Sequence, residues 1–365
     1  MNFRFAIISD LHIAVPHTIW EHPKRFHLVE VSIPALEQIL KNLEKLNLDF
    51  LLLPGDLTQH GEPENHTWLQ KRLELLPYPV YVVPGNHDVP NLLPTERSIG
   101  LKDFPYYYQK CGYTNPQQLY YTSEIIPEVQ LIALNSNQFD SEGKQLGCLD
   151  NEQLIWLENI LGEIKNKLVL VMIHHNVIEH LPGQSRHELG KRYMLDNADI
   201  LKQILRKFGV KLIFTGHLHV QDIAEEKGLV EITTGSIVSY PHPYRVLEYN
   251  NGQLDIESEQ VQEVPGWENL LQTSREWMGD RSYPFMIKLL TSHPLNLNTT
   301  EAEKMAPYLR YFWADIARGD TLFNFPQFPA GINRHFQKFG AIAPDGRANL
   351  IDNRATIKIE QKVGE

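Results

Sequence analysis

Five short apolar segments lie between residue 3 and residue 214, and polar residues follow each of them. These segments are Phe3 to Ile8, Phe50 to Leu53, Val80 to Val83, Leu168 to Ile173 and Lys211 to Phe214. Runs of this length without a polar face are typical of strands that are buried on both sides of a sheet. The pattern therefore predicts a buried sheet with polar side chains at the ends of its strands.

Segments with helical periodicity lie between these strands. They are Val31 to Leu46, Trp68 to Leu76, Asn151 to Ile164 and Asn197 to Phe208. Each carries apolar residues on one face of a helix with 3.6 residues per turn. Because strands alternate with helices, we expect a layered α/β fold.

After Gly216 the pattern changes to pairs of strands without intervening helices. The expected strands are Val220 to Glu225, Leu229 to Thr234, Arg245 to Tyr249 and Leu254 to Gln260. The Asn-Asn-Gly sequence between the last two suits a hairpin turn. We expect these four strands to form an antiparallel second sheet.

From Val264 onward the pattern is helical and aromatic. The expected helices are Trp267 to Met278, Pro284 to Leu290 and Glu301 to Arg318, the last with Thr299 and Thr300 as its N-cap. The chain is thus expected to contain one domain over residues 1–262 and a mainly helical extension over 263–365. The extension is expected to serve as a packing layer, as a cap over the site or as a dimer element.

Polar residues with ligand chemistry follow the expected strands. They are Asp10 and His12, then Asp56, then Asn86 and His87, then His174, and last His217 and His219. The carboxyl ends of parallel strands meet at one edge of a sheet, where ligands bind. Oxygen and nitrogen donors without a thiolate suit Mn²⁺, Fe or Zn²⁺. The set is larger than one ion needs, so we expect two ions that share a bridging carboxylate.

Each of these residues taken alone has a purely structural explanation. Asp10 after a strand could cap a helix, and Gly55-Asp56 could form a turn. His12 alone could be a surface or core histidine, and the pair His217 and His219 is by itself weak evidence for a metal, although in an extended segment both would point to the same face. The occurrence of all these elements in order, each directly after a strand, favours the metal centre.

Composition narrows the class of protein further. The chain has 365 residues, 2 cysteines and a net charge of −11. The acidic charge argues against a binder of extended nucleic acid but not against a small phosphate-ester substrate. Cys111 and Cys148 lie far apart, so we expect no disulfide framework. The start MNFRFAIISD has no charged-then-apolar leader, and no 18-residue apolar run occurs, so we expect a soluble, cytoplasmic protein without membrane contact.

The series DLH, GDLTQHGEP, GNHD, HH and GHLH resembles the calcineurin-like metallophosphoesterase superfamily, and it looks most like the class III cyclic-nucleotide phosphodiesterase branch. The resemblance covers about residues 3 to 260. It implies a four-layer α/β/β/α sandwich of two mixed sheets flanked by helices. It also implies a hydrolase that cleaves small phosphodiesters, of the cyclic-nucleotide or glycerophosphodiester type, with hydroxide activated by two divalent metal ions.

The resemblance assigns roles to particular residues. It implies a first ion bound by Asp10, His12, Asp56 and His219. It implies a second ion bound by Asn86, His174 and His217, with Asp56 as the bridge. His87 corresponds to the catalytic histidine that protonates the leaving group, and Asp88 is expected to orient it.

Substrate contacts stay open at the level of the sequence. Asn176-Val177 follows the paired histidines where that branch usually has prolines, so His175 could face either substrate or solvent. Arg186 lies in a cationic loop, Val177 to Leu195, that either binds substrate or is solvated. Trp20 could stack on a nucleobase or pack its own loop.

Several other functions fit the same metal centre. The main alternative is a phosphomonoesterase, including a protein phosphatase, that uses the same ions. A nuclease is disfavoured by the acidic charge. A metal-free scaffold that binds a protein partner is also disfavoured, because every expected ligand type is present. A homodimer is compatible with all of these functions.

Overall fold

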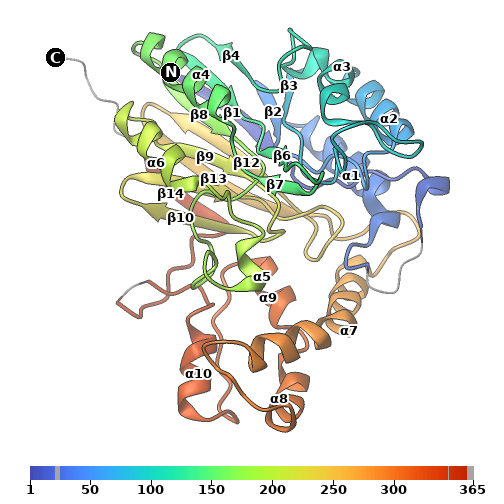
Figure 1. Cartoon of the computed structure of the whole chain (residues 1–365), viewed down its shortest axis with the longest axis vertical. Coiled ribbons are helices and arrows are strands. Elements are labelled where there is room, and N and C mark those ends of the chain that lie inside the picture. The colour runs from blue at the N-terminus through green and yellow to red at the C-terminus, as the bar shows by residue number, and fades with distance from the viewer. Residues whose placement is uncertain (21–24, 344, 360–365) are drawn as a thin grey trace.

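Two six-stranded mixed sheets form the centre of the protein (Figure 1). The computed structural model describes residues 1–20, 25–343 and 345–359. The first sheet has the order β14-β13-β12-β1-β2-β3, and the second has the order β10-β11-β9-β8-β5-β4. The sheets pack against each other through a shared apolar core, in which Phe5 and Phe214 meet with ring centroids 5.7 Å apart. The expected α/β/β/α sandwich is confirmed.

The first sheet combines a parallel half with an antiparallel half. Its strands are β1 (Asn2–Ile7), β2 (Phe50–Leu53), β3 (Val80–Val82), β12 (Pro243–Asn250), β13 (Gln253–Gln260) and β14 (Arg354–Lys358). Strands β1, β2 and β3 are parallel, whereas β12 pairs antiparallel with both β1 and β13. The helices α1 (Ser32–Leu43) and α2 (Pro63–Leu73) pack on this sheet through their apolar faces.

The second sheet has a parallel centre with an antiparallel strand at each edge. Its strands are β4 (Tyr121–Ile126), β5 (Val129–Ala133), β8 (Leu168–Met172), β9 (Leu212–Thr215), β10 (Asp222–Glu226) and β11 (Leu229–Thr233). Helices α4 (Asn151–Glu163) and α6 (Ala198–Lys207) cover its outer face through Leu157, Leu201 and Leu205. This part of the chain also contains α3 (Phe104–Tyr107), α5 (Glu188–Lys191) and the small hairpin of β6 (Asn137–Phe139) and β7 (Gln145–Gly147).

The predicted antiparallel sheet after Gly216 is wrong, although its four strands exist. The β10–β11 hairpin joins the second sheet because β11 pairs in parallel with β9, with Val230 opposite Leu212. The β12–β13 hairpin joins the first sheet because β12 pairs along the whole of β1. Each hairpin thus extends one of the two sheets. The strands β4 to β7 were not predicted.

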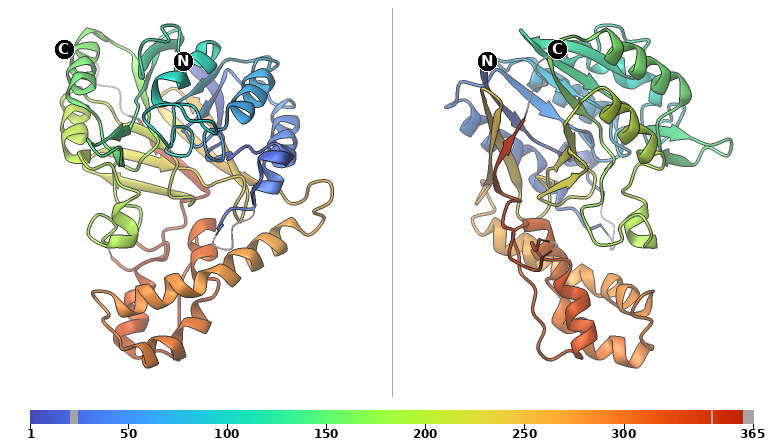
Figure 2. Two further views of the ribbon diagram at one scale, coloured as in Figure 1. Left: turned by 45° about the vertical axis from the view of Figure 1, so that its right-hand side comes forward. Right: turned by 90° about the vertical axis from the view of Figure 1, so that its left-hand side faces the viewer.

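The C-terminal part forms a helical layer at one end of the sandwich (Figure 2). Helix α7 (Leu270–Thr291) runs through Pro284 and joins two predicted helices into one. Helix α8 (Thr299–Met305) is capped by Asn298, whose side chain accepts from the backbone N–H of Glu301, and not by the predicted threonines. The predicted helix to Arg318 is interrupted before α9 (Phe312–Arg318), and α10 (Ala330–Gln337) follows.

The segment 263–365 is mainly helical, as expected, but it also contains one strand in the part that the structure describes. Strand β14 returns to the sandwich and pairs antiparallel with β13, with Ile357 opposite Leu254. The helical layer has its own apolar core, which includes Met278, Met286, Phe312 and Phe336. None of the helices in the described part of the chain combines the length and apolar character that crossing a bilayer requires.

Candidate metal centre

The predicted ligands come together where the parallel strands of both sheets end. Asp10 and His12 follow β1, Asp56 follows β2, Asn86 follows β3, His174 follows β8, and His217 and His219 follow β9. The two sheets therefore contribute ligands from opposite sides of one site. Residues from five separate segments become neighbours because all of these strands point to the same end of the sandwich.

The acidic and histidine side chains form two groups with metal-ligand geometry. In the first group, ligand atoms of Asp10, His12, Asp56 and His219 lie within 4.8 Å of one another. In the second group, those of Asp56, His174 and His217 do so as well. Asp56 belongs to both groups, as a bridging carboxylate must. The side-chain oxygen of Asn86 lies 3.1 Å from Nε2 of His174 and therefore adjoins the second group.

Main-chain hydrogen bonds orient the ligand histidines. Nδ1 of His174 donates to the carbonyl of Pro54 at 2.8 Å, which leaves Nε2 facing Asp56 at 3.4 Å. Nε2 of His217 donates to the carbonyl of Arg192 at 3.2 Å, which leaves Nδ1 for an ion. Such outer contacts fix the tautomer and direction of metal-binding imidazoles. Nε2 of His174 and Nδ1 of His217 are thus the atoms that can donate a lone pair to a metal ion.

The backbone at the ligands is strained. Asp10, His12, Asp56, His217 and His219 all have φ between 44° and 67°, in the left-handed region. Such conformations cost about 1–3 kcal/mol each for residues with side chains, and they persist mainly at functional sites. Five of the seven predicted ligands share this feature, which supports a binding role over simple turns.

Two glycines allow the ligand loops to approach one another. A Cβ atom on Gly85 would lie 2.2 Å from Oδ1 of Asp56. A Cβ atom on Gly216 would lie 2.4 Å from Oδ2 of Asp10. The glycines of the GNHD and GHLH sequences are therefore required by close contact with carboxylates of the centre.

The charge state of the centre suits cations. Burial lowers the pKa of His12 and of His217 well below its usual value, and neighbouring imidazoles lower it further. Burial alone would raise the pKa of Asp56, but His174 and His87 hold it well below its usual range. His12 and His217 thus offer neutral imidazoles, and Asp56 offers an ionised carboxylate, as metal binding requires. Burial alone would lower the pKa of His174, but Asp56 raises it to about 9, so an ion at this ring would displace a proton. The donor set fits divalent ions.

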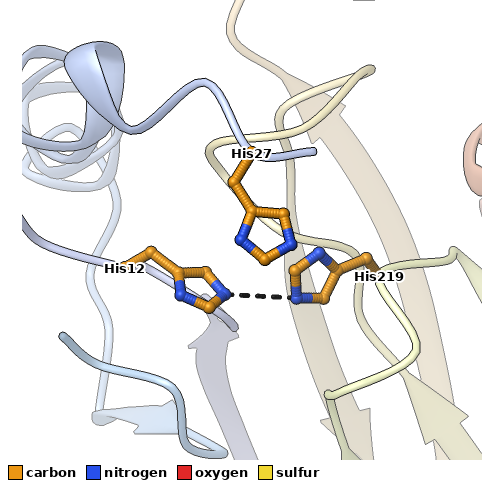
Figure 3. A group of neighbouring side chains, drawn as sticks. All are labelled: His12, His27 and His219. Carbon is orange, nitrogen blue, oxygen red and sulfur yellow. Dashed lines mark hydrogen bonds between the residues drawn. The ribbon is translucent and has the colours of Figure 1, made fainter. Parts of the chain in front are cut away.

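His27 is a neighbour of the centre that the motifs do not include. Its ring centroid lies 4.4 Å from that of His12 and 4.6 Å from that of His219 (Figure 3). Nitrogen atoms of the three rings lie within 4.8 Å of one another, so they could hold an ion together. The sequence signal is weak, because His27 ends a long loop after β1 and belongs to no strand-end motif.

His87 lies beside the first group and is held by the main chain. Its Nδ1 donates to the carbonyl of Gln59 at 2.7 Å, and its backbone N–H donates to Oδ1 of Asp56 at 2.8 Å. The ring meets that of His12 edge to face at 4.7 Å. These contacts leave Nε2 of His87 for a reaction at the centre.

The expected role of Asp88 in orienting His87 is wrong. The buried carboxylate of Asp88 accepts from the backbone N–H groups of Leu57, Thr58 and Gly85 and from the Thr58 hydroxyl, at 2.8 to 3.0 Å. Both carboxylate oxygens are therefore engaged by the loop after β2. Asp88 joins this loop to the loop after β3, and the Gln59 carbonyl orients the imidazole instead.

A cavity of about 960 Å³ connects the centre with the C-terminal helices. Asp56, Asn86, His87, His217 and His219 line one part of it. Residues of α7, α9 and α10 line another part. The substrate would therefore lie between the sandwich and the helical layer.

The three predicted substrate contacts have different positions. His175 is buried, lines the cavity and bonds through Nδ1 to the hydroxyl of Ser136 at 2.7 Å. Arg186 is exposed and also lines the cavity. Trp20 does not line it, and its ring lies 4.6 Å from that of His60. From the same loop as Arg186, His180 forms a buried ion pair with Glu231 and therefore does not face substrate.

Comparison with known proteins agrees with the geometry. Residues 3–221 match the family model described as calcineurin-like phosphoesterase. A probable glycerophosphodiester phosphodiesterase of Arcobacter nitrofigilis is 29% identical over 47% of this chain, and the match spans just over half, 56%, of that relative. A probable cyclic nucleotide phosphodiesterase of Synechococcus sp. is 30% identical over 63% of this chain and 78% of the relative.

The fold also resembles that of a solved structure. A dimetal phosphatase from Danio rerio superposes with a TM-score of 0.52 and 17% identity, over 71% of this chain and 96% of that one. The similarity concerns the fold of the sandwich. The helical layer accounts for most of the C-terminal residues that lie beyond the family match.

Proposed function

The chain belongs to the calcineurin-like phosphoesterase family, and we propose that it hydrolyses small phosphodiesters with two divalent metal ions. The observation that carries the proposal is the position of Asp56, whose carboxylate belongs to both ligand groups. A shared carboxylate is the feature that separates a two-ion site from two unrelated clusters.

The first ion would be held by Asp10, His12, Asp56 and His219. The second would be held by Asp56, Asn86, His174 and His217. Mn²⁺, Fe or Zn²⁺ suits these oxygen and nitrogen donors. When bound, the ions supply Lewis acidity at the phosphate and lower the pKa of water.

His87 would donate a proton to the leaving oxygen. Its Nδ1–H is fixed on the Gln59 carbonyl, so a second proton on Nε2 points toward the centre. The carbonyl stabilises the positive charge of the doubly protonated ring. His87 is thus held with Nε2 in a position from which a proton can be donated to the leaving oxygen.

The names of the relatives favour a diester over a monoester. Two of them are named for glycerophosphodiesters and for cyclic nucleotides, both of which contain a phosphodiester. The net charge of −11 is unfavourable for binding long nucleic acids but leaves small phosphodiesters as substrates.

The test compares bis-p-nitrophenyl phosphate with p-nitrophenyl phosphate. Metal-stripped protein is reconstituted with Mn²⁺, Fe²⁺ or Zn²⁺, and the bound metal is counted in parallel. We expect about two ions per chain and faster turnover of the diester. Faster turnover of the monoester would make the protein a phosphatase, and little metal with no turnover would make it a scaffold.

A further inference from the structure

Helix α7 turns an apolar stripe toward the cavity. Met278, Phe285, Met286 and Leu289 line the cavity, and their spacing places them on one face of the helix. Met278 and Met286 are buried in the core of the helical layer, but Phe285 is 39% exposed and Leu289 is half-buried. The stripe therefore extends from the apolar core of the helical layer to the accessible surface of the cavity.

The polar residue within the stripe does not interrupt its apolar character. Ser282 lies between Met278 and Phe285, and its hydroxyl oxygen lies 2.8 Å from each of the carbonyls of Gly279 and Arg310, either of which can accept its single proton. Its hydrogen-bonding capacity is thus directed into the protein. Apart from Ser282, the α7 side chains that line the cavity are apolar.

Other elements extend this apolar wall. Trp313 of α9, Phe339 after α10 and Leu189 of α5 also line the cavity, and each is only half-buried. Large apolar side chains that stay accessible in a concave site mark a binding surface for an apolar group. The volume of about 960 Å³ lies near the upper end of the range for small-molecule sites.

The apolar wall is joined directly to the metal centre. Leu218, which lies between two of the candidate ligands, is buried in the same apolar cluster as Met278 and Phe312. Phe26, next to His27, contacts Phe285 with ring centroids 5.7 Å apart. The cavity beside the metal centre is therefore continuous with the α7 stripe.

The charges in the cavity suit an anionic ligand. Arg186, Arg192 and Lys338 line it, whereas Asp56 and Glu188 are the only carboxylates among its described lining residues. His187 adds an Nε2 that has no hydrogen-bond partner, while its Nδ1 accepts from the backbone of Leu189. Excess cations beside an apolar wall match an anionic amphiphile.

We propose that the α7 stripe binds the apolar arm of an amphiphilic phosphodiester, whose phosphate lies at the metal centre and whose second ester group is a long alkyl or acyl chain. This inference rests on the proposed diester hydrolysis and specifies the substrate class. The reaction is unchanged, because water attacks phosphorus and one ester oxygen leaves with a proton.

The test uses ethyl and octyl esters of p-nitrophenyl phosphate with the metal-loaded protein, below the concentration at which the octyl ester forms micelles. We expect kcat/KM for the octyl ester to exceed that for the ethyl ester at least about tenfold, because the added methylenes become buried. Phe285→Ala and Leu289→Ala should each lower this ratio severalfold, because each removes part of the apolar wall that the octyl chain contacts. Tyr283→Ala is the control, since Tyr283 is exposed on α7 but does not line the cavity.

The outcomes separate this inference from the function on which it rests. If kcat/KM is nearly the same for the octyl and ethyl esters in the unaltered protein, the proposed binding of an apolar arm is wrong. The proposed diester hydrolysis would still stand. If neither ester is cleaved, the proposed function fails, and the stripe is then tested by binding of octylphosphonate and ethylphosphonate in calorimetry. Equal affinity for these two phosphonates would overturn the inference, and tighter octylphosphonate binding that Phe285→Ala removes would support it.

Discussion

The imidazole of His87 donates its Nδ1 proton to the main-chain carbonyl of Gln59, 2.7 Å away. The candidate acid is therefore oriented by the backbone of the GDLTQHGEP segment and not by the side chain that follows it. A carbonyl accepts but cannot donate, so it fixes one tautomer of the neutral ring. A side-chain substitution in this segment that leaves the Gln59 carbonyl in place should therefore not change the orientation of His87.

Replacing His87 by Ala tests its role as a proton donor. We expect metal content near that of the unaltered protein, because His87 belongs to neither ligand group. Turnover should fall about 10²–10⁴-fold for phenyl esters, whose leaving group needs a proton, and much less for p-nitrophenyl esters. Steady-state rates for both series check this, and an equal loss in the two would refute the acid role.

Replacing Asp56 by Asn tests the bridge between the ions. An amide lacks the charge to compensate two cations, so we expect loss of at least one ion together with diester turnover. Elemental analysis after dialysis measures the metal directly. Asp199→Asn, at an exposed site on α6, provides the control. Two ions retained in the Asp56 variant would contradict the shared carboxylate.

Replacing His27 by Ala tests whether the third imidazole contributes to the first ion. The ring of His27 lies beside those of His12 and His219. We therefore expect the His27 variant to bind one of the two metal ions about 10- to 100-fold more weakly. Competition with a chromophoric chelator measures the affinity for each of the two ions and needs no substrate. His17→Ala, an exposed histidine earlier in the same loop, should bind as the unaltered protein does. Unchanged affinity in the His27 variant would exclude it as a ligand.

Stability should depend on pH through His180, which lies between Asp222 at 2.5 Å and Glu231 at 3.0 Å. Burial alone would lower the pKa of His180, but the two carboxylates raise it to about 10. A raised histidine pKa stabilises the folded state fully below about pH 6.5, and this contribution is lost as pH rises through the folded value. The free energy of unfolding should therefore fall by several kcal/mol over that interval.

Urea unfolding of the metal-free protein at a series of pH values measures this dependence. His180→Gln keeps a hydrogen-bonding side chain but cannot carry the charge. We expect the variant to be less stable at pH 6.5, and its difference from the unaltered protein should shrink toward pH 10. A constant difference across the interval would show that the ion pair is not the source.

The metal centre could be predicted from the sequence because its ligands directly follow strands. Asp10, Asp56 and His174 lie at strand ends that the apolar pattern locates, and parallel strands bring such ends together. Alternation identifies a strand but not its partner, so β11 and β12 were assigned to the wrong sheet.

Other parts of the site depend on tertiary contacts that no local pattern records. His27 reaches the centre through a long loop, and its neighbour Phe26 rests on Phe285 of α7, more than two hundred and fifty positions along the chain. The adjacency of His87 and Asp88 suggested a contact that the loop geometry prevents, because Asp88 faces the donors of the β2 loop. Helix α7 passes through Pro284, where a sequence pattern favours a break.

The pairing of β14 with β13 makes the helical layer an insertion within a single hairpin. A truncation after residue 262, where the family-like region ends, would also delete an edge strand and uncover the backbone of β13. Excision of the segment between Val261 and Asn353, with a short turn in its place, would instead keep every strand of the sheet. The layer is therefore joined to the sandwich by two neighbouring chain crossings, one after β13 and one before β14.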